Sequence, residues 1–282
     1  MKKTRLFIAL LVMLVAASSY AQDSYRETVK QFVSANGQID RMQSAFTTMN
    51  ETFFKKTEGV DLNALTERYV KERLNDQMTD LVLPMMKERN VTEAELRALN
   101  EMLATPKFQT FLTHQNEWIE KLSQISEECI SQLIDGEEPE NIQLNPDIDA
   151  GYAAKFQKMW KESGKEEKSI GLYNKLSLDE NTEEFAKIGK CKTWLADNLG
   201  TIALNAAYGT LTLEDFDLGM ELYTNESYRK ATDTSDLNVF SVVGPTAEII
   251  IKYLDWMESQ GAQPSEKFLA LKVLMQSMNY KP

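Results

Sequence analysis

Residues 91–108, VTEAELRALNEMLATPKF, decide the fold class. Thr92 followed three residues later by Glu95 is a capping-box pattern, in which each side chain bonds the other residue's backbone amide at a helix start. The helix that it opens carries its apolar side chains on one face, at Leu96, Leu99, Met102 and Leu103. Thr105-Pro106 then starts a second helix, because proline at the first helical position loses no backbone hydrogen bond. The stretch predicts two consecutive amphipathic helices.

The same helical period continues on both sides of this stretch. Apolar residues recur at i, i+3, i+4 and i+7, whereas no convincing alternation of period two is present. Pro84 and Pro245 are expected to kink or interrupt their helices, because proline removes a backbone donor. The pattern predicts an all-α fold with helices at about 29–36, 39–53, 62–85, 93–103, 106–135, 152–163, 182–208, 212–223, 236–259 and 265–279.

The helices are expected to form two related antiparallel bundles in tandem. A polar stretch with Pro and Gly at 135–149 predicts a linker. It separates an N-terminal helical domain, 22–134, from a C-terminal one, 150–282. Thr92 aligns with Thr212 at an offset of 120 residues, and the helix cap, the following acid and the apolar phase coincide. Duplication is the interpretation that we favour, although two unrelated amphipathic helices could also align in this way.

The segment Val91–Phe108 resembles the domain of unknown function 2059 family, helical proteins exported by Gram-negative bacteria. Thr92-Glu93-Ala94-Glu95-Leu96 matches that family's helix start, and Thr105-Pro106 matches the break before its next helix. Met102-Leu103 stands where the family has an aromatic pair. The resemblance covers roughly Tyr25–Ser126 and, more faintly, Ala150–Met257. It implies a helical, exported protein, and it implies no activity, cofactor or catalytic residue.

Residues 1–21 predict a secretory signal peptide. A basic start (Lys2, Lys3, Arg5) precedes the apolar run Leu6–Ala17, and small residues before position 22 predict cleavage after Ala21. The alternative, a membrane anchor, needs about 20 apolar residues, and this run is shorter. We therefore expect a periplasmic or secreted protein without a transmembrane segment after cleavage.

Composition argues against several function classes. Asp and Glu outnumber Lys and Arg by 43 to 31, which gives a net charge of -12 and disfavours nucleic-acid binding. The single histidine, His114, lies one helical turn from Phe111 and from Trp118, which predicts a boundary position on a helix. It has no second histidine for a zinc site, and no Gly-x-Ser-x-Gly elbow supplies a nucleophile. We expect no metal, no cofactor and no enzymatic activity.

Two sets of residues are candidate sites. Cys129 and Cys191 are the only cysteines, and they form either one intramolecular disulfide or two buried free thiols. Met85, Met86, Met102, Met159 and Trp160 could line an apolar groove, because Met side chains adapt to varied surfaces. Methionines and aromatics at helical spacing also fit a packed core, and this second interpretation is the stronger one.

Three functions follow from these features. The first is a non-enzymatic module that binds an unidentified protein partner or supports the cell envelope. The second is a carrier of an apolar ligand, lipid or peptide, in a groove between helices. The third is a carboxylate-based enzyme acting on glycans, which requires two acids facing each other across a cleft. The scarcity of catalytic side chains favours the first.

Overall fold

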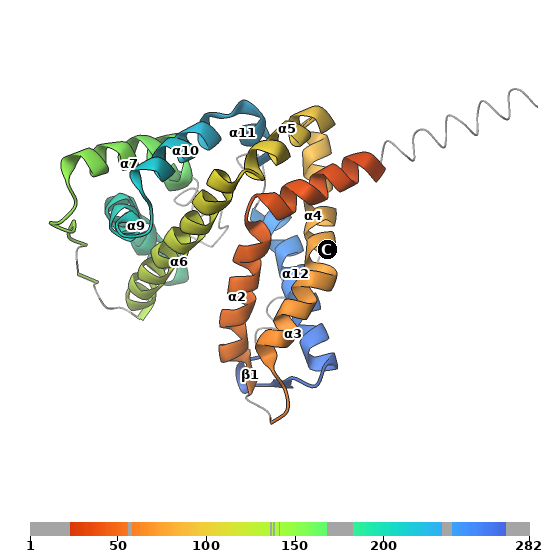
Figure 1. The fold of residues 1–282 in the computed structure, drawn as a ribbon. Helices are drawn as coiled ribbons and strands as arrows, with labels where there is room; N and C mark the ends of the chain where they lie inside the picture. The colour runs from red at the N-terminus through yellow and green to blue at the C-terminus, as the bar shows by residue number, and fades with distance from the viewer. Residues whose placement is uncertain are drawn as a thin grey trace, which may run out of the picture. The chain divides into compact units, whose positions relative to one another are not determined.

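The structure, a computed structural model, describes residues 23–55, 58–135, 137, 139–140, 142–167, 183–232 and 239–268. Over these ranges the fold is all-α, as the periodicity predicts (Figure 1). The exception is a small antiparallel pair of strands, β1 (Phe54–Lys55) and β2 (Gln263–Pro264). The described part of the chain divides into two compact units: unit 1 comprises its residues up to Ala104 together with those from Ile249 onward, and unit 2 comprises those from Thr105 to Glu248.

Unit 1 joins the first part of the chain to a distant segment. After a helix over residues 23–35 come α2 (Gln38–Phe53), α3 (Leu62–Tyr69), the π-helical turn η1 (Val70–Leu74), α4 (Asn75–Glu88) and α5 (Glu93–Leu103). The end of α12 (Val239–Ser259) completes the unit. Tyr253 of α12 is fully buried, with its ring stacked on Phe46 of α2 at 3.9 Å between centroids and edge-on to Tyr69 at 5.1 Å. Burial of these rings holds α12 against α2 and α3.

Two pairs of helices make the most extensive contacts in unit 2. Its helices are α6 (Pro106–Asp135), α7 (Ala150–Ser163), α9 (Glu183–Ala207), α10 (Leu213–Thr224), α11 (Glu226–Thr232) and the start of α12. α6 packs along α9, and α7 packs along α10. Trp118 of α6 is fully buried, edge-on to Phe156 and Trp160 of α7, and its Nε1 donates to the Ala203 carbonyl oxygen of α9 at 2.9 Å. This indole links three of the four helices.

The predicted helix starts are confirmed. Thr92 caps α5 through a capping box with Glu95, and Thr212 caps α10 through a capping box with Asp215. Pro106 is the first residue of α6. A helix cap depends only on side chains within one turn of the helix start. For that reason these helix starts can be predicted from the sequence alone.

The division into units differs from the expected one. α6 was expected in the N-terminal domain, but it belongs to unit 2, because its apolar stripe packs on α9. Unit 1 also takes residues from the C-terminal half of the chain, so a boundary at 135–149 does not separate the two units. Pro84 and Pro245 do not end their helices, since α4 and α12 continue past them. The predicted signal peptide 1–21 and most of the predicted helix 265–279 lie outside the described residues.

Candidate functional site

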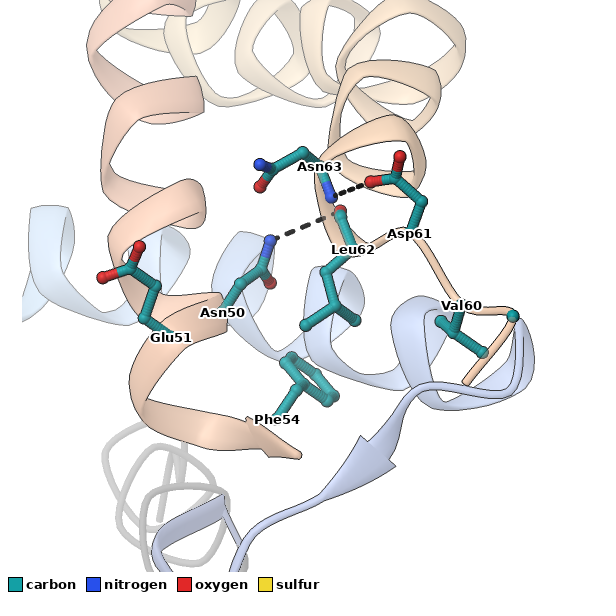
Figure 2. A pocket seen from close by; sticks show the side chains of 8 residues that line it. Asn50, Glu51, Phe54, Val60, Asp61, Leu62 and Asn63 are labelled. Atoms are coloured by element: carbon teal, nitrogen blue, oxygen red, sulfur yellow. Dashed lines mark hydrogen bonds between the residues drawn. The ribbon is translucent and has the colours of Figure 1, made fainter. Parts of the chain in front are cut away.

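A pocket lies in unit 1 where α2 ends and α3 begins (Figure 2). Its volume is about 1020 Å³. The end of α2 with β1, the turn at 58–61 and the first residues of α3 line it: Asn50, Glu51, Phe54, Gly59, Val60, Asp61, Leu62 and Asn63. The pocket is therefore built by one short stretch of sequence.

Two local features shape the turn at the edge of this pocket. Gly59 has a φ of +80°, in the left-handed region that favours glycine. Asp61 is the N-cap of α3, and its Oδ1 accepts hydrogen bonds from the backbone N–H groups of Asn63 and Ala64, both at 3.0 Å. Gly59 and the cap together reverse the chain and direct it into α3.

A closed ring of buried polar groups includes Asn50, one of the residues that line the pocket. Asn50 Nδ2 donates to Thr66 Oγ1 at 2.7 Å, the Thr66 hydroxyl lies 2.8 Å from the Tyr253 hydroxyl, and Tyr253 donates to Asn50 Oδ1 at 2.6 Å. Burial raises the pKa of Tyr253, so this phenol stays protonated. Because the groups satisfy one another, the ring ties α2, α3 and α12 together without leaving an unpaired polar atom among its members.

The lining of the pocket is half apolar and half polar. Phe54 and Leu62 point toward each other (Figure 2), and two acids, Glu51 and Asp61, belong to the lining, whereas none of its eight residues is basic. One oxygen of Asp61 is already engaged in capping α3. A molecule that fits this lining has an apolar part together with a cationic or hydrogen-bond-donating group.

A second feature, on unit 2, is a set of exposed apolar side chains. Among the described residues, the large apolar side chains that remain exposed are Leu144 at 48%, Tyr208 at 37% and Leu213 at 51%. We call these three residues the apolar patch. They come from the segment before α7, the end of α9 and the first position of α10.

Hydrogen bonds hold the segments that carry the residues of the apolar patch. The Asn205 side chain of α9 accepts from the Asn145 backbone N–H at 2.9 Å and donates to the Gln143 carbonyl at 2.8 Å, which holds Leu144 within one turn of Tyr208. The buried Tyr152 hydroxyl lies 2.8 Å from the Ala207 carbonyl oxygen and 2.9 Å from that of Leu211. Its ring is edge-on to Tyr208 at 5.7 Å. The segments that carry the patch are therefore fixed before any partner arrives.

Acidic residues flank Leu144 and Leu213 in the sequence. The sequence has no Lys, Arg or His over residues 122–154, nor over residues 193–228. Exposed acids lie beside the patch in the chain: Asp147, Asp149, Glu214 and Asp217. The first base after the gap, Lys155, bonds both Asp217 carboxylate oxygens, at 3.1 and 3.2 Å. The segments that carry the patch are therefore rich in exposed acids, and a negatively charged surface attracts cationic partners.

His114 has a structural partner rather than a set of metal ligands. It is half-buried, as the boundary position predicts, and its Nδ1 lies 2.9 Å from Asp215 Oδ2. The same Asp215 oxygen accepts from the backbone N–H and the hydroxyl of Thr212 at the start of α10. Over the described ranges, no group of three or more His, Cys, Asp and Glu side chains could hold a metal ion. The His114–Asp215 pair thus links α6 to the N-terminus of α10.

The five residues expected for an apolar groove lie in two different cores. Met85, Met86 and Met102 belong to unit 1, whereas Met159 and Trp160 belong to unit 2. Met86, Met159 and Trp160 are buried, and the other two are half-buried. None of the five lines the pocket of Figure 2. Their placement fits the interpretation as core residues.

Both cysteines lie in unit 2 as buried free thiols, Cys129 on α6 and Cys191 on α9. Burial raises the pKa of both thiols, and the charge of Glu128 raises that of Cys129 further. A thiol in this state reacts slowly with oxidants and electrophiles, since the thiolate is the nucleophile.

Sequence reasoning missed both the pocket and the apolar patch. The sequence does contain a signal for each. Gly59 followed by a capping Asp61 marks a tight turn before a helix, and Leu144 is an apolar residue inside a stretch that is otherwise rich in acids and prolines. Neither pattern, however, shows which side chains the fold buries and which it leaves exposed.

Comparison with protein-family models, with curated proteins and with solved structures finds no significant match to this chain. The resemblance to the exported helical family therefore stays a prediction. Within the part of the chain that the structure describes, no helix is both long and apolar enough to cross a membrane.

Proposed function

We propose that this protein is a non-enzymatic binding module, exported to the periplasm or beyond the cell, whose protein partner docks on the apolar patch of unit 2. The observation that carries the proposal is the exposure of Leu144, Tyr208 and Leu213 on segments of that unit that hydrogen bonds hold in place. Removing apolar surface from water is worth about 25 cal/mol per Å². Covering these side chains therefore supplies a driving force for association.

The charge around the apolar patch defines the partner. Acids occupy the flanking segments, and the 122–154 and 193–228 stretches contain no base. A basic protein segment with apolar side chains complements such a surface, and the opposite charges also speed its approach. Nucleic acids and anionic lipids carry phosphate charges that this surface repels. The partner that we propose is an amphipathic, Lys- and Arg-rich segment of another protein.

The frame beneath the apolar patch favours tight binding. Asn205 and Tyr152 fix the two loops by hydrogen bonds to backbone groups. A surface that is already ordered loses less conformational entropy when it binds. Binding at this surface is therefore expected without a rearrangement of unit 2.

Titration calorimetry with synthetic peptides tests the proposal. The probe is an amphipathic helical peptide of Leu and Lys, and the comparison peptide has Glu in place of each Lys. Wild type should bind the Lys peptide, and Leu144→Ser with Leu213→Ser should weaken this binding at least about ten-fold, which corresponds to about 1.4 kcal/mol. The matched control, Leu144→Met with Leu213→Met, keeps the apolar surface and should bind like wild type.

Charge variants separate the contribution of the acids. Asp147→Asn with Glu214→Gln should weaken binding of the Lys peptide and reduce its salt dependence. Glu58→Gln with Glu101→Gln removes two exposed acids from unit 1. This control should change neither the affinity for the Lys peptide nor the salt dependence of binding. Equal affinity of the Ser variant and wild type, or equal affinity for the Lys and Glu peptides, would overturn the proposal.

The pocket of unit 1 supports a second candidate, a carrier of a small amphipathic ligand. Its volume, about 1020 Å³, lies at the upper end of the range of ligand pockets. Native mass spectrometry of the protein isolated from its own source should then find an added mass that denaturation removes. Val60→Trp, which fills the pocket, should lose that mass. A bare polypeptide mass in wild type would remove this candidate.

A further inference from the structure

The register of α6 against α9 follows from one hydrogen bond. Trp118 Nε1 of α6 donates to the carbonyl oxygen of Ala203 in α9, so these two residues lie at similar levels along the helix pair, to within about one turn. The positions of other residues follow from the helical rise of about 1.5 Å per residue, once the relative direction of the two helices is known.

The length of the connecting chain establishes this direction. The Ile142 backbone N–H donates to Asn198 Oδ1, and seven residues separate Ile142 from the end of α6 at Asp135. If the helices were parallel, Asp135 and Asn198 would lie about 33 Å apart along the axis. Seven extended residues span at most about 25 Å. In the antiparallel arrangement the separation is about 18 Å, which the chain covers, so α6 and α9 run antiparallel.

The two cysteines then lie at similar levels. Cys129 is eleven residues after Trp118, and Cys191 is twelve residues before Ala203. In an antiparallel pair these steps run in the same direction, about 16.5 Å on α6 and about 18 Å on α9. The two cysteines therefore lie within about one helical turn of the same level, 5.4 Å.

Both cysteines also lie on the buried faces of their helices. Each residue of a helix turns by about 100°, so Cys129, eleven residues after Trp118, points within about 20° of the direction of the Trp118 side chain around the helix axis. The Trp118 side chain is fully buried. Cys191 lies one turn before Leu195 and three turns before Ile202, and both of these residues are buried. Only 8% of Cys129 and 2% of Cys191 is exposed.

We propose that Cys129 and Cys191 form an intramolecular disulfide that joins α6 to α9. The oxidant is an external disulfide, on a small thiol compound or on a dithiol protein. The thiolate of one cysteine attacks it, forms a mixed disulfide and releases one thiolate. The second cysteine, as its thiolate, attacks the protein sulfur of the mixed disulfide and releases the other. Two protein thiols lose two protons and two electrons, and the external disulfide becomes two thiols.

The bond forms during folding. Once α6 and α9 have closed, burial disfavours the thiolate of both residues, and exchange becomes slow. The same burial then shields the finished bond from reductants. The proposal is independent of the apolar patch and of any partner.

Oxidative refolding of the full chain tests the proposal. The reduced, denatured protein is diluted into a mixture of oxidised and reduced glutathione, unfolded again under quenching conditions, and alkylated. The refolded monomer should take up no alkyl group, should be two hydrogen atoms lighter than the reduced chain, and should give one linked peptide that contains Cys129 and Cys191. Cys129→Ser and Cys191→Ser, which each keep one thiol, should give no linked peptide. Reductant should lower the melting temperature of wild type but not of either variant.

A parallel sample held in denaturant in the same glutathione mixture shows whether the fold brings the thiols together. It should contain mainly glutathione adducts rather than the linked peptide. Two alkylated cysteines in the refolded monomer, a bond found only between chains, or equal linkage in the folded and unfolded samples would overturn the proposal.

Discussion

The sulfur of Met159 on α7 lies only 2.5 Å from the point where a β-carbon on Gly219 of α10 would stand. The Met159 Cγ is 2.9 Å from the same point. Glycine at this position therefore allows α7 and α10 to approach closely, and the aromatic cluster of Phe156 and Phe216 packs across the same pair of helices.

Gly219→Ala should destabilise the protein by about 1–3 kcal/mol, because the added methyl group overpacks a filled contact. Gly200→Ala is the matched control. It lies inside α9, and a β-carbon there meets no atom within 4 Å. It should stabilise the protein by about 0.5–1 kcal/mol, because alanine favours the helix. Denaturant unfolding measures both, and similar effects of the two substitutions would contradict the packing described.

Trp118→Phe should destabilise the protein by about 1–3 kcal/mol, because it removes the hydrogen bond to Ala203 and part of a buried ring. Trp194→Phe is the matched comparison on α9. The Trp194 Nε1 is buried without a hydrogen-bond partner in the described structure. Burying this N–H group away from water costs free energy that no hydrogen bond offsets, and phenylalanine removes that cost. Trp194→Phe should cost clearly less than Trp118→Phe in the same unfolding measurement. The reverse order would contradict the register of α6 and α9.

Alkaline pH should weaken the fold through two buried tyrosines. Burial raises the pKa of Tyr69 and of Tyr152 to about 12, from an ordinary value of 10.0. The folded protein holds these protons more tightly than the unfolded chain does. The stabilising contribution is therefore fully present below pH 10 and is lost as the pH rises from 10 toward about 12.

Urea midpoints measured over this range, with Tyr69→Phe and Tyr152→Phe, check the assignment. Each variant loses some stability at neutral pH, because Tyr69 donates to Gln77 and Tyr152 bonds the Ala207 carbonyl. Above pH 10, each should lose stability less steeply than wild type. An unchanged slope in both variants would assign the alkaline transition to other groups.

Local chemistry in the sequence predicted a large part of the helical structure. Thr92 and Thr212 start their helices with capping boxes, and Pro106 starts α6, because these signals act within one turn. The apolar periodicity also predicted where most helices lie. Each of these inferences needs only neighbouring residues.

The packing partners could not be predicted in this way. An apolar stripe shows that α6 buries one face, but it does not identify α9 as the helix that covers it. The return of α12 to unit 1 depends on Tyr253 meeting Thr66, which lies 187 positions earlier. The segment 142–149 has the composition of a linker, but the Asn205 side chain holds it against α9. Asn205 bonds backbone groups of this segment, and backbone groups are the same in every sequence, so the contact cannot be predicted from the residue types.

The candidate sites were also hidden for a physical reason. Leu144 and Leu213 are apolar residues like many others in the chain, and only the fold leaves them exposed. The pocket needs the Gly59 turn, the Asp61 cap and the buried ring behind Asn50 at the same time. Sequence alone supplied the first two signals and not the third.

The most direct test of docking on the apolar patch is amide hydrogen exchange of the full chain, with and without the Leu and Lys peptide at saturating concentration. Docking on the apolar patch predicts slower exchange in 142–149 and 208–214, and no change around the pocket at 58–63. The Leu144→Ser with Leu213→Ser variant should lose this protection at the same peptide concentration. Protection that appears elsewhere, or that persists in the variant, would show that the peptide does not dock on the apolar patch.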